Sequence, residues 1–391
     1  MRVLISADTY YPHVNGASYF AQRLAEYLQK RGNQVAVICP GESFKHTKKV
    51  INGILVYGAR SVPVLVYRDF RFSFYVEDSF VQKIIDEFKP DVIHIQAHFV
   101  VGRRVAKVAF RNNLPLVATN HFMPENLTHY IPLPNFVVRM ISEFMWRDFA
   151  KVFNTASRIS TPTKIAAGLI ENRVNKDVES ISCGIDLDRF TPNDSGVMIR
   201  EKYNLPDRPV LLFVGRLDKE KNVDLVLKSV AIALKFVDFQ FVVVGKGAEK
   251  KNLERLAQRL SITDNVTFTG FVSDGDLPAM YRASDCFIIA GTAELQSIVT
   301  MEAMASGLPV LAVNAVALPE LVLDNENGFL FGHGDIDDLA GKMVKIFTDE
   351  KLREKMAQLG LEIIAKHDIN ESMVTFERMY NEEILKKKNV E

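Results

Sequence analysis

The sequence has few cysteines, no long hydrophobic run and no net charge, and each absence excludes a class of protein. Its three cysteines, Cys39, Cys183 and Cys286, are far apart and odd in number. We therefore expect neither a disulfide framework nor a zinc site, and a cytosolic location. No run of about 18 apolar residues is present, so we expect no membrane-spanning helix. The opening MRVLISADTYY is interrupted by polar residues too soon for a signal peptide and predicts a first strand.

The net charge of zero hides an asymmetry between the two halves. Residues 1–190 carry 24 Lys and Arg against 17 Asp and Glu, and residues 191–391 carry 24 against 31. A basic half beside an acidic half indicates that the two halves bind different partners. A chance imbalance of charged residues on solvated faces would give the same residue counts. The basic residues match no nucleic-acid recognition motif, so we expect no nucleic acid among the partners.

The length and the pattern of apolar residues predict two α/β domains. At 391 residues the chain exceeds what one hydrophobic core usually supports. Short β-branched runs alternate with amphipathic stretches twice over, with a polar, turn-rich linker at 184–195 between the two series. We predict domains at 1–190 and 191–369 and a C-terminal helix at 370–391. The expected strands are 3–6, 35–39, 91–95, 116–119, 158–161 and 178–181, then 210–214, 240–244, 266–268, 286–289 and 309–313.

Two cations follow the first strand of the second domain. Doubly wound sheets bind ligands at the carboxyl ends of their strands, and Gly215 stands there, followed by Arg216 and Lys221. A guanidinium fork and an ammonium five residues later can converge on one diphosphate. Gly245, after the next strand, is explained as well by a tight turn as by contact with a phosphate.

Two glutamates separated by seven residues follow a later strand. Glu294 lies in a loop and Glu302 on a helix that we expect to begin near Ser297. The backbone N–H groups of Ser297, Ile298 and Val299 then form a phosphate site, because a helix N-terminus has unpaired donors. The two carboxylates suit two polyol groups of one ligand, although Glu302 could be an ordinary exposed helix residue.

These motifs together resemble glycosyltransferase family four over nearly the whole chain. The resemblance rests on Gly215-Arg216…Lys221-Asn222, Gly245-Lys-Gly247, Gly270-Phe-Val272, Glu294-x7-Glu302 and the run EAMASGLPV from Glu302. It implies the GT-B fold of two facing Rossmann-like domains with a cleft between them, and a hexosyltransferase that retains the anomeric configuration.

The resemblance also implies roles for individual residues. Arg216 and Lys221 would bind the donor diphosphate, Glu294 the donor sugar, and Glu302 the ribose. His121 would stand near the reacting sugar, although a histidine with a satisfied hydrogen bond is the plainer interpretation. The remaining donor-binding positions are Gly16, Gly215, Gly245, Phe271, Val272, Ser297, Ile298 and Val299.

Three positions depart from the family pattern. Ser297 replaces a common glycine, and its hydroxyl could cap the helix. Ala17 stands where many members have a second glycine after Gly16, and Cys183 stands where an asparagine is usual. None of the three removes a charged donor contact.

We expect neither a metal nor another cofactor, because Arg216, Lys221 and the helix N-terminus can stabilise the leaving diphosphate. Asp274-Gly-Asp276 is interpreted as a turn. His13 offers an alternative, since inverting GT-B enzymes use an N-terminal histidine as a base, but the double-glutamate motif argues against inversion.

The acceptor is predicted from the N-terminal domain. Residues 135–152 form an apolar helix with a basic edge, which could lie in a membrane interface with Trp146 inserted and Arg139 and Arg147 toward anionic lipid, or could pack against its own domain. The pattern His121-x3-Glu125-x3-His129-Tyr130 resembles bacterial monoglucosyldiacylglycerol synthases. We therefore expect transfer of glucose from UDP to a membrane lipid such as diacylglycerol, by a protein peripheral on the inner face of the cell membrane.

Other functions keep much of the same pattern. A transferase acting on a soluble or polysaccharide acceptor would keep every donor residue. A GT-B sugar-nucleotide epimerase would need no acceptor, and a non-catalytic nucleotide-sugar binder could lose Glu294.

Overall fold

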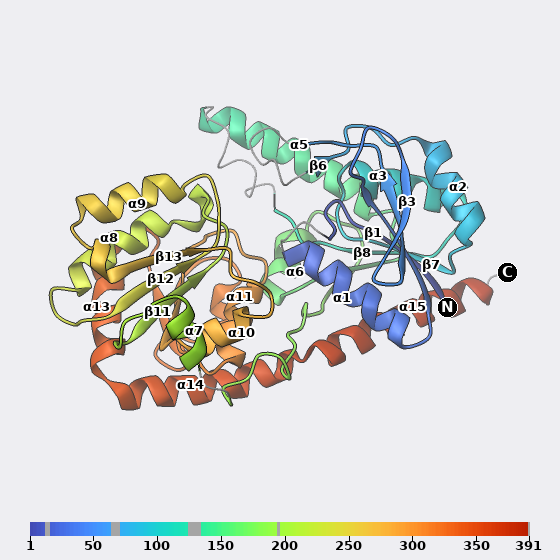
Figure 1. Ribbon diagram of the computed structural model, residues 1–391. Coiled ribbons are helices and arrows are strands. Elements are labelled where there is room, and N and C mark those ends of the chain that lie inside the picture. The colour runs from blue at the N-terminus through green and yellow to red at the C-terminus, as the bar shows by residue number, and fades with distance from the viewer. Residues whose placement is uncertain (12–15, 64–70, 124–133, 194–195, 390–391) are drawn as a thin grey trace. The chain divides into compact units, whose positions relative to one another are not determined.

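The chain divides into two compact units (Figure 1). The computed structural model describes residues 1–391 apart from 12–15, 64–70, 124–133, 194–195 and 390–391. Unit 1 comprises Met1–Cys183 with Asn370–Glu391, and unit 2 comprises Gly184–Ile369. The first boundary therefore falls at 183/184, where the sequence suggested 190/191, and the C-terminal helix groups with unit 1.

Unit 1 is built on an eight-stranded sheet in the order β10-β9-β8-β7-β1-β2-β4-β3. All neighbours pair in parallel except β3 with β4. The strands β1, β7 and β8 are almost fully buried, as expected of apolar runs covered on both faces. The strands are β1 (Arg2–Ser6), β2 (Gln34–Pro40), β3 (Thr47–Ile51), β4 (Ile54–Ala59), β7 (Val92–Ile95), β8 (Leu116–Thr119), β9 (Arg158–Thr161) and β10 (Val178–Ser180), with a separate ribbon of β5 (Val62–Pro63) and β6 (Arg71–Phe72).

Helices cover this sheet, and the last helix of the chain is part of the unit. They are α1 (Gly16–Lys30), α2 (Asp78–Phe88), α3 (Val100–Arg111), α5 (Asn135–Phe153), α6 (Lys164–Glu171) and α15 (Ile369–Lys388). The α15 helix packs Phe376 against Phe20 of α1, with ring centroids 5.3 Å apart. The hydroxyl of Tyr380, also in α15, forms a 2.6 Å hydrogen bond with Nδ1 of the buried His94. These contacts explain why residues 370–391 belong to unit 1.

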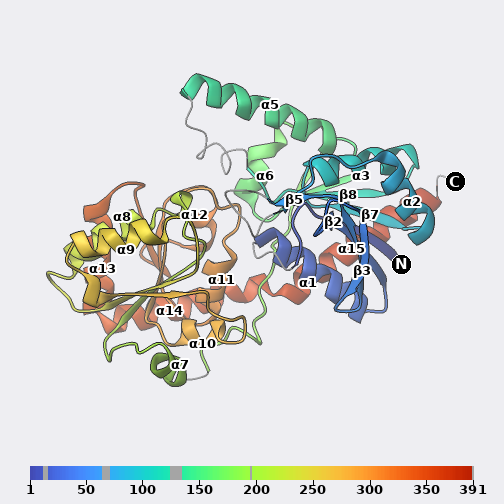
Figure 2. The same cartoon turned by 45° about the horizontal axis from the view of Figure 1, so that its top comes forward.

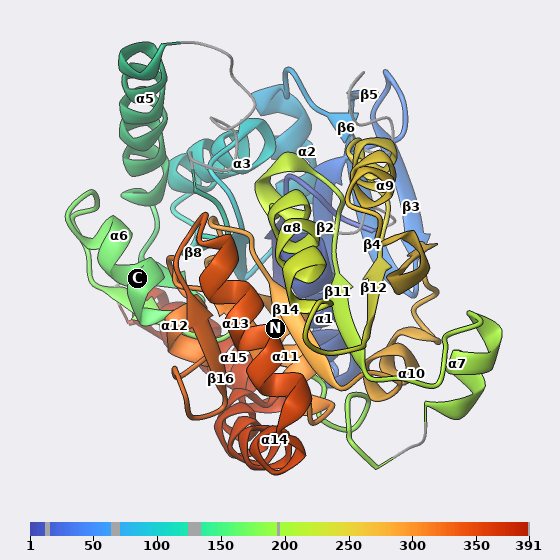
Figure 3. The same ribbon diagram turned by 90° about the vertical axis from the view of Figure 1, so that its left-hand side faces the viewer.

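Unit 2 is built on a six-stranded parallel sheet in the order β13-β12-β11-β14-β15-β16. The strands are β11 (Val210–Val214), β12 (Gln240–Val244), β13 (Val266–Gly270), β14 (Cys286–Ile289), β15 (Val310–Val313) and β16 (Gly328–Phe331). Figure 3 shows α8 and α13 side by side on this unit. Its helices are α7 (Val197–Lys202), α8 (Val223–Ala233), α9 (Lys250–Arg259), α10 (Leu277–Arg282), α11 (Ile298–Ala305), α12 (Leu318–Leu321), α13 (Ile336–Thr348) and α14 (Glu350–Ile364), with 3-10 turns at Lys219–Lys221, Thr263–Asn265 and Ala365–His367.

In both sheets the strand order reverses direction at the first strand of the unit. In unit 2, β11 lies between β12 and β14, and in unit 1, β1 lies between β2 and β7. Chain connections leave to opposite sides at these points, so a crevice opens at the carboxyl ends of the two neighbouring strands, where ligands of such folds bind. The two reversals therefore mark where each unit is expected to hold a ligand.

Some elements differ from the sequence prediction. The strands β3, β4, β5, β6 and β16 were not predicted, and Gly16 is the first residue of α1. Three of the five residues of β3 are polar and none is fully buried, so this edge strand lacks the apolar run that marked the others. The helix that follows Gly245, α9, begins at Lys250.

Candidate functional site

The loops after β11 and β14 meet at the strand-order reversal of unit 2. The Nζ atom of Lys221, in the first loop, lies 2.7 Å from Oε1 of Glu294, in the second. Asn222 ties the same loops together, because its side-chain amide donates to the carbonyl of Ala290 at 2.9 Å. Asn222 adopts a left-handed backbone (φ 51°), which asparagine tolerates better than most residues. The sequence predicted that Lys221 and Glu294 serve one ligand, and they lie in contact.

Burial alone would lower the pKa of the Lys221 ammonium, but the carboxylates of Glu294 and Glu220 outweigh it and raise the pKa. The ammonium is therefore charged at neutral pH.

Arg216 is held by two carboxylates of its own loop. Its guanidinium lies 2.8 Å from Oδ2 of Asp218 and 2.8 Å from Oε1 of Glu220, and both acids are buried. The Arg216 side chain is itself 43% exposed, so a face of it is open to solvent. The carboxylates fix the direction of the guanidinium, as a positioning pair does for a ligand-binding cation.

Asp218 and Glu220 were missed as site residues. The sequence could have indicated both residues, because they stand between Arg216 and Lys221 in the loop that carries these two cations. With Glu294 they give the cluster three acidic groups against two basic ones, so an incoming diphosphate competes with carboxylates for the cations.

The helix α11 begins where the sequence predicted, with Ser297 as its N-cap. The Ser297 hydroxyl oxygen accepts hydrogen bonds from the backbone N–H of Thr300 at 3.3 Å and from the Thr300 hydroxyl at 2.8 Å. The serine therefore caps the helix, as expected from its replacement of glycine. A role for the N–H groups of Ser297, Ile298 and Val299 toward phosphate stays a prediction.

Glu302 is not the exposed helix residue of the plainer interpretation. It is 6% exposed, one turn into α11. The fully buried Tyr281 of α10 donates its hydroxyl to Glu302 Oε2 at 2.9 Å. Burial and the Glu302 carboxylate raise the pKa of Tyr281, so its proton stays in place to orient that carboxylate. Tyr281 was not identified from the sequence, because only its packing reveals the contact.

The glycines of the site serve close packing of the backbone. A side chain on Gly245 (φ +141°) would place its Cβ 1.8 Å from the carbonyl oxygen of Gly215. Gly245 therefore lets the ends of β11 and β12 approach each other, which supports the tight-turn interpretation.

The two residues predicted beside the base differ in accessibility. Phe271 is 57% exposed, with the Lys246 ammonium 5.6 Å from its ring centroid, and is open to stack on a base. Val272 is 5% exposed and packs in the core of unit 2. Only its backbone is then free to lie beside a base, and that placement stays a prediction.

His121 lies one residue beyond Asn120 at the end of β8 in unit 1. Its ring packs 4.8 Å from Phe20, and Nδ1 lies 3.9 Å from the Cys183 sulfur, while Nε2 has no hydrogen-bond partner among the described residues. Burial lowers the pKa of His121 to about 4, so the imidazole is neutral at physiological pH. The predicted acceptor residues Glu125, His129 and Tyr130, and His13 of the alternative mechanism, lie outside the described residues.

The helix α5 corrects one predicted membrane contact. Trp146 is 6% exposed, packs at right angles to Phe149 at 5.4 Å, and lies under the Arg173 guanidinium at 4.7 Å. It cannot insert into a lipid interface, because the core of unit 1 already holds it. Arg139 and Arg147 are exposed, as predicted.

Other apolar residues of α5 are exposed instead. Phe136, Met140 and Phe144 are 74%, 65% and 72% exposed. Their spacing of four residues places them along one side of the helix. Figures 1, 2 and 3 all show one end of α5 standing clear of the sheet of unit 1.

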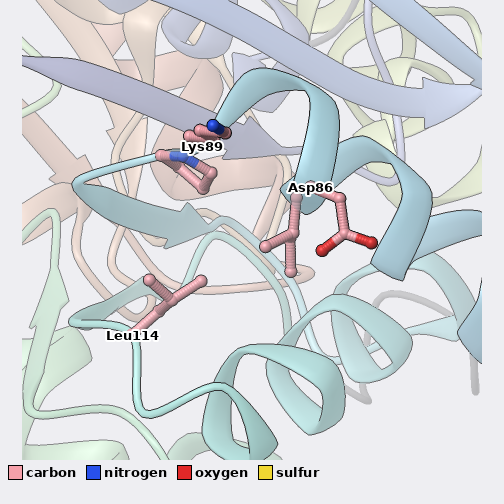
Figure 4. Close-up of a pocket in the computed structure, with 5 residues that line it drawn as sticks. Asp86, Lys89 and Leu114 are labelled. Atoms are coloured by element: carbon pink, nitrogen blue, oxygen red, sulfur yellow. The ribbon is translucent and has the colours of Figure 1, made fainter.

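A shallow hollow of about 420 Å³ lies elsewhere on unit 1, beside the C-terminal end of α2 (Figure 4). Asp86, Lys89 and Leu114 line it, with Ile85 and Pro90. None of the predicted site residues lies there, and its lining residues Pro90 and Leu114 come just before β7 and β8, at the opposite end of these strands from their carboxyl ends.

Two family models match the chain. The model described as "Glycosyltransferase Family 4" matches residues 14–189, and the model described as "Glycosyl transferases group 1" matches residues 198–362. The chain belongs to glycosyltransferase family four. It is a hexosyltransferase with the GT-B fold.

Individual relatives agree with this assignment. The chain is 29% identical over 382 residues to the alpha-monoglucosyldiacylglycerol synthase of Streptococcus pneumoniae, covering 94% of this chain and 84% of that protein. It is 26% identical over 368 residues to the GDP-mannose-dependent alpha-mannosyltransferase of Mycobacterium tuberculosis, covering 91% and 90%. Among solved structures, HepE of Anabaena in complex with UDP superposes with a TM-score of 0.78, at 20% identity, over 98% of this chain and 100% of that one. This last likeness supports the fold.

Two absences among the described residues bear on the predicted partners. No helix among them is both long enough and apolar enough to cross a membrane. No group of three or more His, Cys, Asp or Glu side chains within the described ranges is arranged to hold a metal ion. Independence from metals and other cofactors stays a prediction.

Proposed function

We propose that this glycosyltransferase moves glucose from UDP to a hydroxyl of a membrane lipid such as diacylglycerol, with retention of the anomeric configuration and without a metal. The observation that carries the donor chemistry is the contact of Lys221 with Glu294 beside Arg216, at the strand-order reversal of unit 2. This cluster joins cations suited to a diphosphate with a carboxylate suited to sugar hydroxyls.

The proposed reaction breaks the bond between the anomeric carbon and the β-phosphate oxygen, and forms a bond from the same carbon to the acceptor oxygen. Positive charge develops on the sugar ring and negative charge on the leaving diphosphate. Arg216 and Lys221 stabilise the negative charge, because preorganised cations cost little reorganisation at the moment of reaction. A phosphate oxygen of the leaving group takes the acceptor's proton, and attack on the same face retains the configuration.

Glu294 positions the donor sugar in this scheme and is not a nucleophile. Its carboxylate already pairs with Lys221 at 2.7 Å. Binding of the diphosphate by Lys221 is therefore coupled to binding of the sugar by Glu294. Glu302, oriented by Tyr281, binds the ribose hydroxyls, and Phe271 stacks on the base.

Two observations support a lipid acceptor. A relative that spans most of the chain is named for the synthesis of monoglucosyldiacylglycerol. The α5 helix exposes Phe136, Met140 and Phe144 together with Arg139 and Arg147, a combination of apolar and basic groups that suits an anionic lipid surface. We propose that the protein binds peripherally to the inner face of the cell membrane through this helix.

The second candidate is transfer of mannose from GDP, or transfer to a soluble acceptor. The GDP-mannose-dependent relative favours it, since it covers almost the same length of the chain. Every donor residue discussed above would keep its role, and the base and acceptor would change.

The deciding experiment incubates the full chain with labelled UDP-glucose, UDP-galactose, GDP-mannose and ADP-glucose, each with and without diacylglycerol in phosphatidylglycerol vesicles. The expected product is an α-glucosyl lipid from UDP-glucose, identified by the proton coupling at the anomeric carbon. A β-linked product would overturn the retaining mechanism and favour the His13 alternative. Transfer to a soluble acceptor with none to the vesicles would overturn the lipid assignment.

A further inference from the structure

A chain of buried hydrogen bonds joins α15 to the end of β8. The hydroxyl of Tyr380 bonds to Nδ1 of His94 at 2.6 Å, and Nε2 of His94 bonds to Oγ1 of Thr119 at 2.7 Å. Thr119 is the last residue of β8, and its Oγ1 also lies 2.7 Å from Oγ of Ser160 in β9. These four side chains are at most 1% exposed. The reaction as proposed above uses none of them.

The hydrogen-bonded chain is satisfied throughout. Burial, with a smaller contribution from the neighbouring His121 ring, lowers the pKa of His94 to about 3, so one of its ring nitrogens is a donor and the other an acceptor. Hydroxyl groups stand at both nitrogens and can donate or accept. A buried network with every member satisfied is held in one arrangement. It therefore fixes Thr119, two residues before His121.

A second route from α15 to His121 runs through packed rings. The Phe376 ring lies edge-on to that of Phe20 in α1, with centroids 5.3 Å apart, and the Phe20 ring lies 4.8 Å from that of His121. Phe376 also stacks on His94 at 5.6 Å. Figures 1 and 2 show α15 beside α1. Because Phe376 and Tyr380 are four residues apart, they share one face of α15, and both routes start there.

These contacts decide the direction of the His121 ring. Its Nδ1 lies 3.9 Å from the sulfur of Cys183, and burial raises the pKa of this thiol to about 12, so the sulfur keeps its proton. Phe20 and Cys183 thus hold the ring, while its Nε2 has no hydrogen-bond partner within the described ranges. Since burial also keeps His121 neutral, packing and not an ion pair sets its orientation.

We propose that Phe376 and Tyr380 of α15 are positioning residues, which hold His121 in the orientation that sugar transfer needs. Neither side chain has to touch a substrate, because Phe376 acts through Phe20 and Tyr380 acts through His94. This inference rests on the proposed function, since it takes His121 to lie near the reacting sugar. It gives the last helix of the chain a part in catalysis in addition to its part in the stability of unit 1.

The first test is Phe376→Leu, which keeps an apolar side chain and removes the ring that contacts Phe20 and His94. We expect kcat for transfer from UDP-glucose to dihexanoylglycerol to fall about tenfold or more, because small displacements of a group at the reacting centre cost that much. Donor KM should not change, because the charged donor contacts belong to unit 2.

The matched control is Phe88→Leu. Phe88 is a buried phenylalanine in the core of the same unit, at the end of α2. This variant should lower thermal stability much as Phe376→Leu does and leave kcat unchanged. A kcat in Phe376→Leu equal to that of the control would overturn the route through packed rings.

A second variant, Tyr380→Phe, removes only the hydroxyl and leaves the packing in place, so it keeps the inference testable if Phe376→Leu does not fold. Nδ1 of His94 then loses its partner, and we expect kcat to fall several-fold with donor KM unchanged. A kcat equal to that of the wild type would overturn the hydrogen-bonded route.

The titration of His121 reports the position of its ring, and a loss of stability alone would not move it. NMR signals of protein labelled at histidine Cε1 are followed between about pH 5 and 8, and His121→Gln identifies the signal. Burial lowers the pKa of His121 to about 4, whereas a ring released toward water titrates near pH ~6.5. We expect this pKa to rise in Phe376→Leu, to rise less in Tyr380→Phe, and to stay unchanged in Phe88→Leu.

This measurement needs no turnover, so it separates the inference from the proposed function. If no nucleotide sugar supports transfer, the proposed function fails, and a raised pKa of His121 in the two α15 variants still supports the positioning of this ring by α15. An unchanged pKa of His121 in both variants would overturn the inference, whatever their activity.

Discussion

At the scale of single residues, the hydrogen bond from Tyr281 fixes the direction of the Glu302 carboxylate. The hydroxyl of Tyr281 holds one carboxylate oxygen at 2.9 Å inside the core of unit 2. A carboxylate held in this way offers its remaining capacity in a fixed direction, which is what discrimination between a ribose and a deoxyribose requires.

The first prediction concerns Tyr281→Phe. The buried carboxylate loses a donor, so we expect the free energy of unfolding to fall by about 1–3 kcal/mol. Preference for a ribonucleotide donor over its 2′-deoxy and 3′-deoxy analogues should fall several-fold, measured as a ratio of kcat/KM.

Tyr380→Phe is the control, because Tyr380 is equally buried but bonds to His94 in unit 1. It should lower stability and leave the ribose preference unchanged. A ribose preference that persists in Tyr281→Phe would show that Glu302 does not depend on this hydrogen bond.

At the scale of elements, α5 has one side in the core and another side exposed. Trp146 and Phe149 pack into unit 1, while Phe136 and Phe144 remain outside. Burying a phenylalanine in an apolar phase is worth about 1.5–3 kcal/mol, so two of them give useful affinity for a lipid surface.

The second prediction is that the double variant Phe136→Ser/Phe144→Ser binds phosphatidylglycerol vesicles at least about tenfold more weakly in flotation assays, because its apolar anchors are lost. The matched control is Phe110→Ser/Phe236→Ser, whose phenylalanines are 69% and 71% exposed on other helices or their ends. Equal vesicle binding by the two double variants would contradict a membrane role for α5.

Some secondary-structure elements could be predicted from the sequence and others could not. The buried parallel strands were predictable, because each is an uninterrupted apolar run of the right length. The edge strand β3 was missed because its sequence, TKKVI, has three polar residues in a row and no apolar run of the expected length.

For the site, Arg216, Lys221, Glu294 and Glu302 were predictable, since they stand at motif positions beside strand ends. The burial of Trp146 was not, because its cover, Arg173, comes from a different part of the chain.

At the scale of the whole molecule, the two units differ in their response to acid. Unit 1 holds His94, His98 and His121, whose pKa values burial lowers to about 3, 4 and 4. An unfolded histidine titrates near pH ~6.5, so below that pH the unfolded unit binds more protons than the folded one. The free energy of unfolding therefore falls as the pH drops from neutral toward about 4.

The third prediction is that the free energy of unfolding of unit 1, measured with urea, is lower at pH 5 than at pH 7.5 by roughly 1–2 kcal/mol for each buried histidine, so that the urea midpoint falls as well. Fluorescence of Trp146, the single tryptophan of the chain, reports this unit alone. Burial raises the pKa of Asp8 to about 6, which acts in the opposite direction, but it is one group against three. A midpoint at pH 5 that equals or exceeds the value at pH 7.5 would contradict the burial of these rings.

The central claim is that unit 2 binds the donor diphosphate through Arg216 and its neighbours. Isothermal titration of UDP, GDP and ADP into the wild type, Arg216→Ala and Arg208→Ala tests it most directly, since Arg208 is an arginine of the same unit that pairs with Asp238 at 2.8 Å. We predict that a nucleoside diphosphate binds the wild type and Arg208→Ala equally, and that Arg216→Ala loses about tenfold or more, as expected for hydrogen bonds between charged groups. Equal affinity in Arg216→Ala, or no binding of any of the three nucleotides to the wild type, would contradict the account.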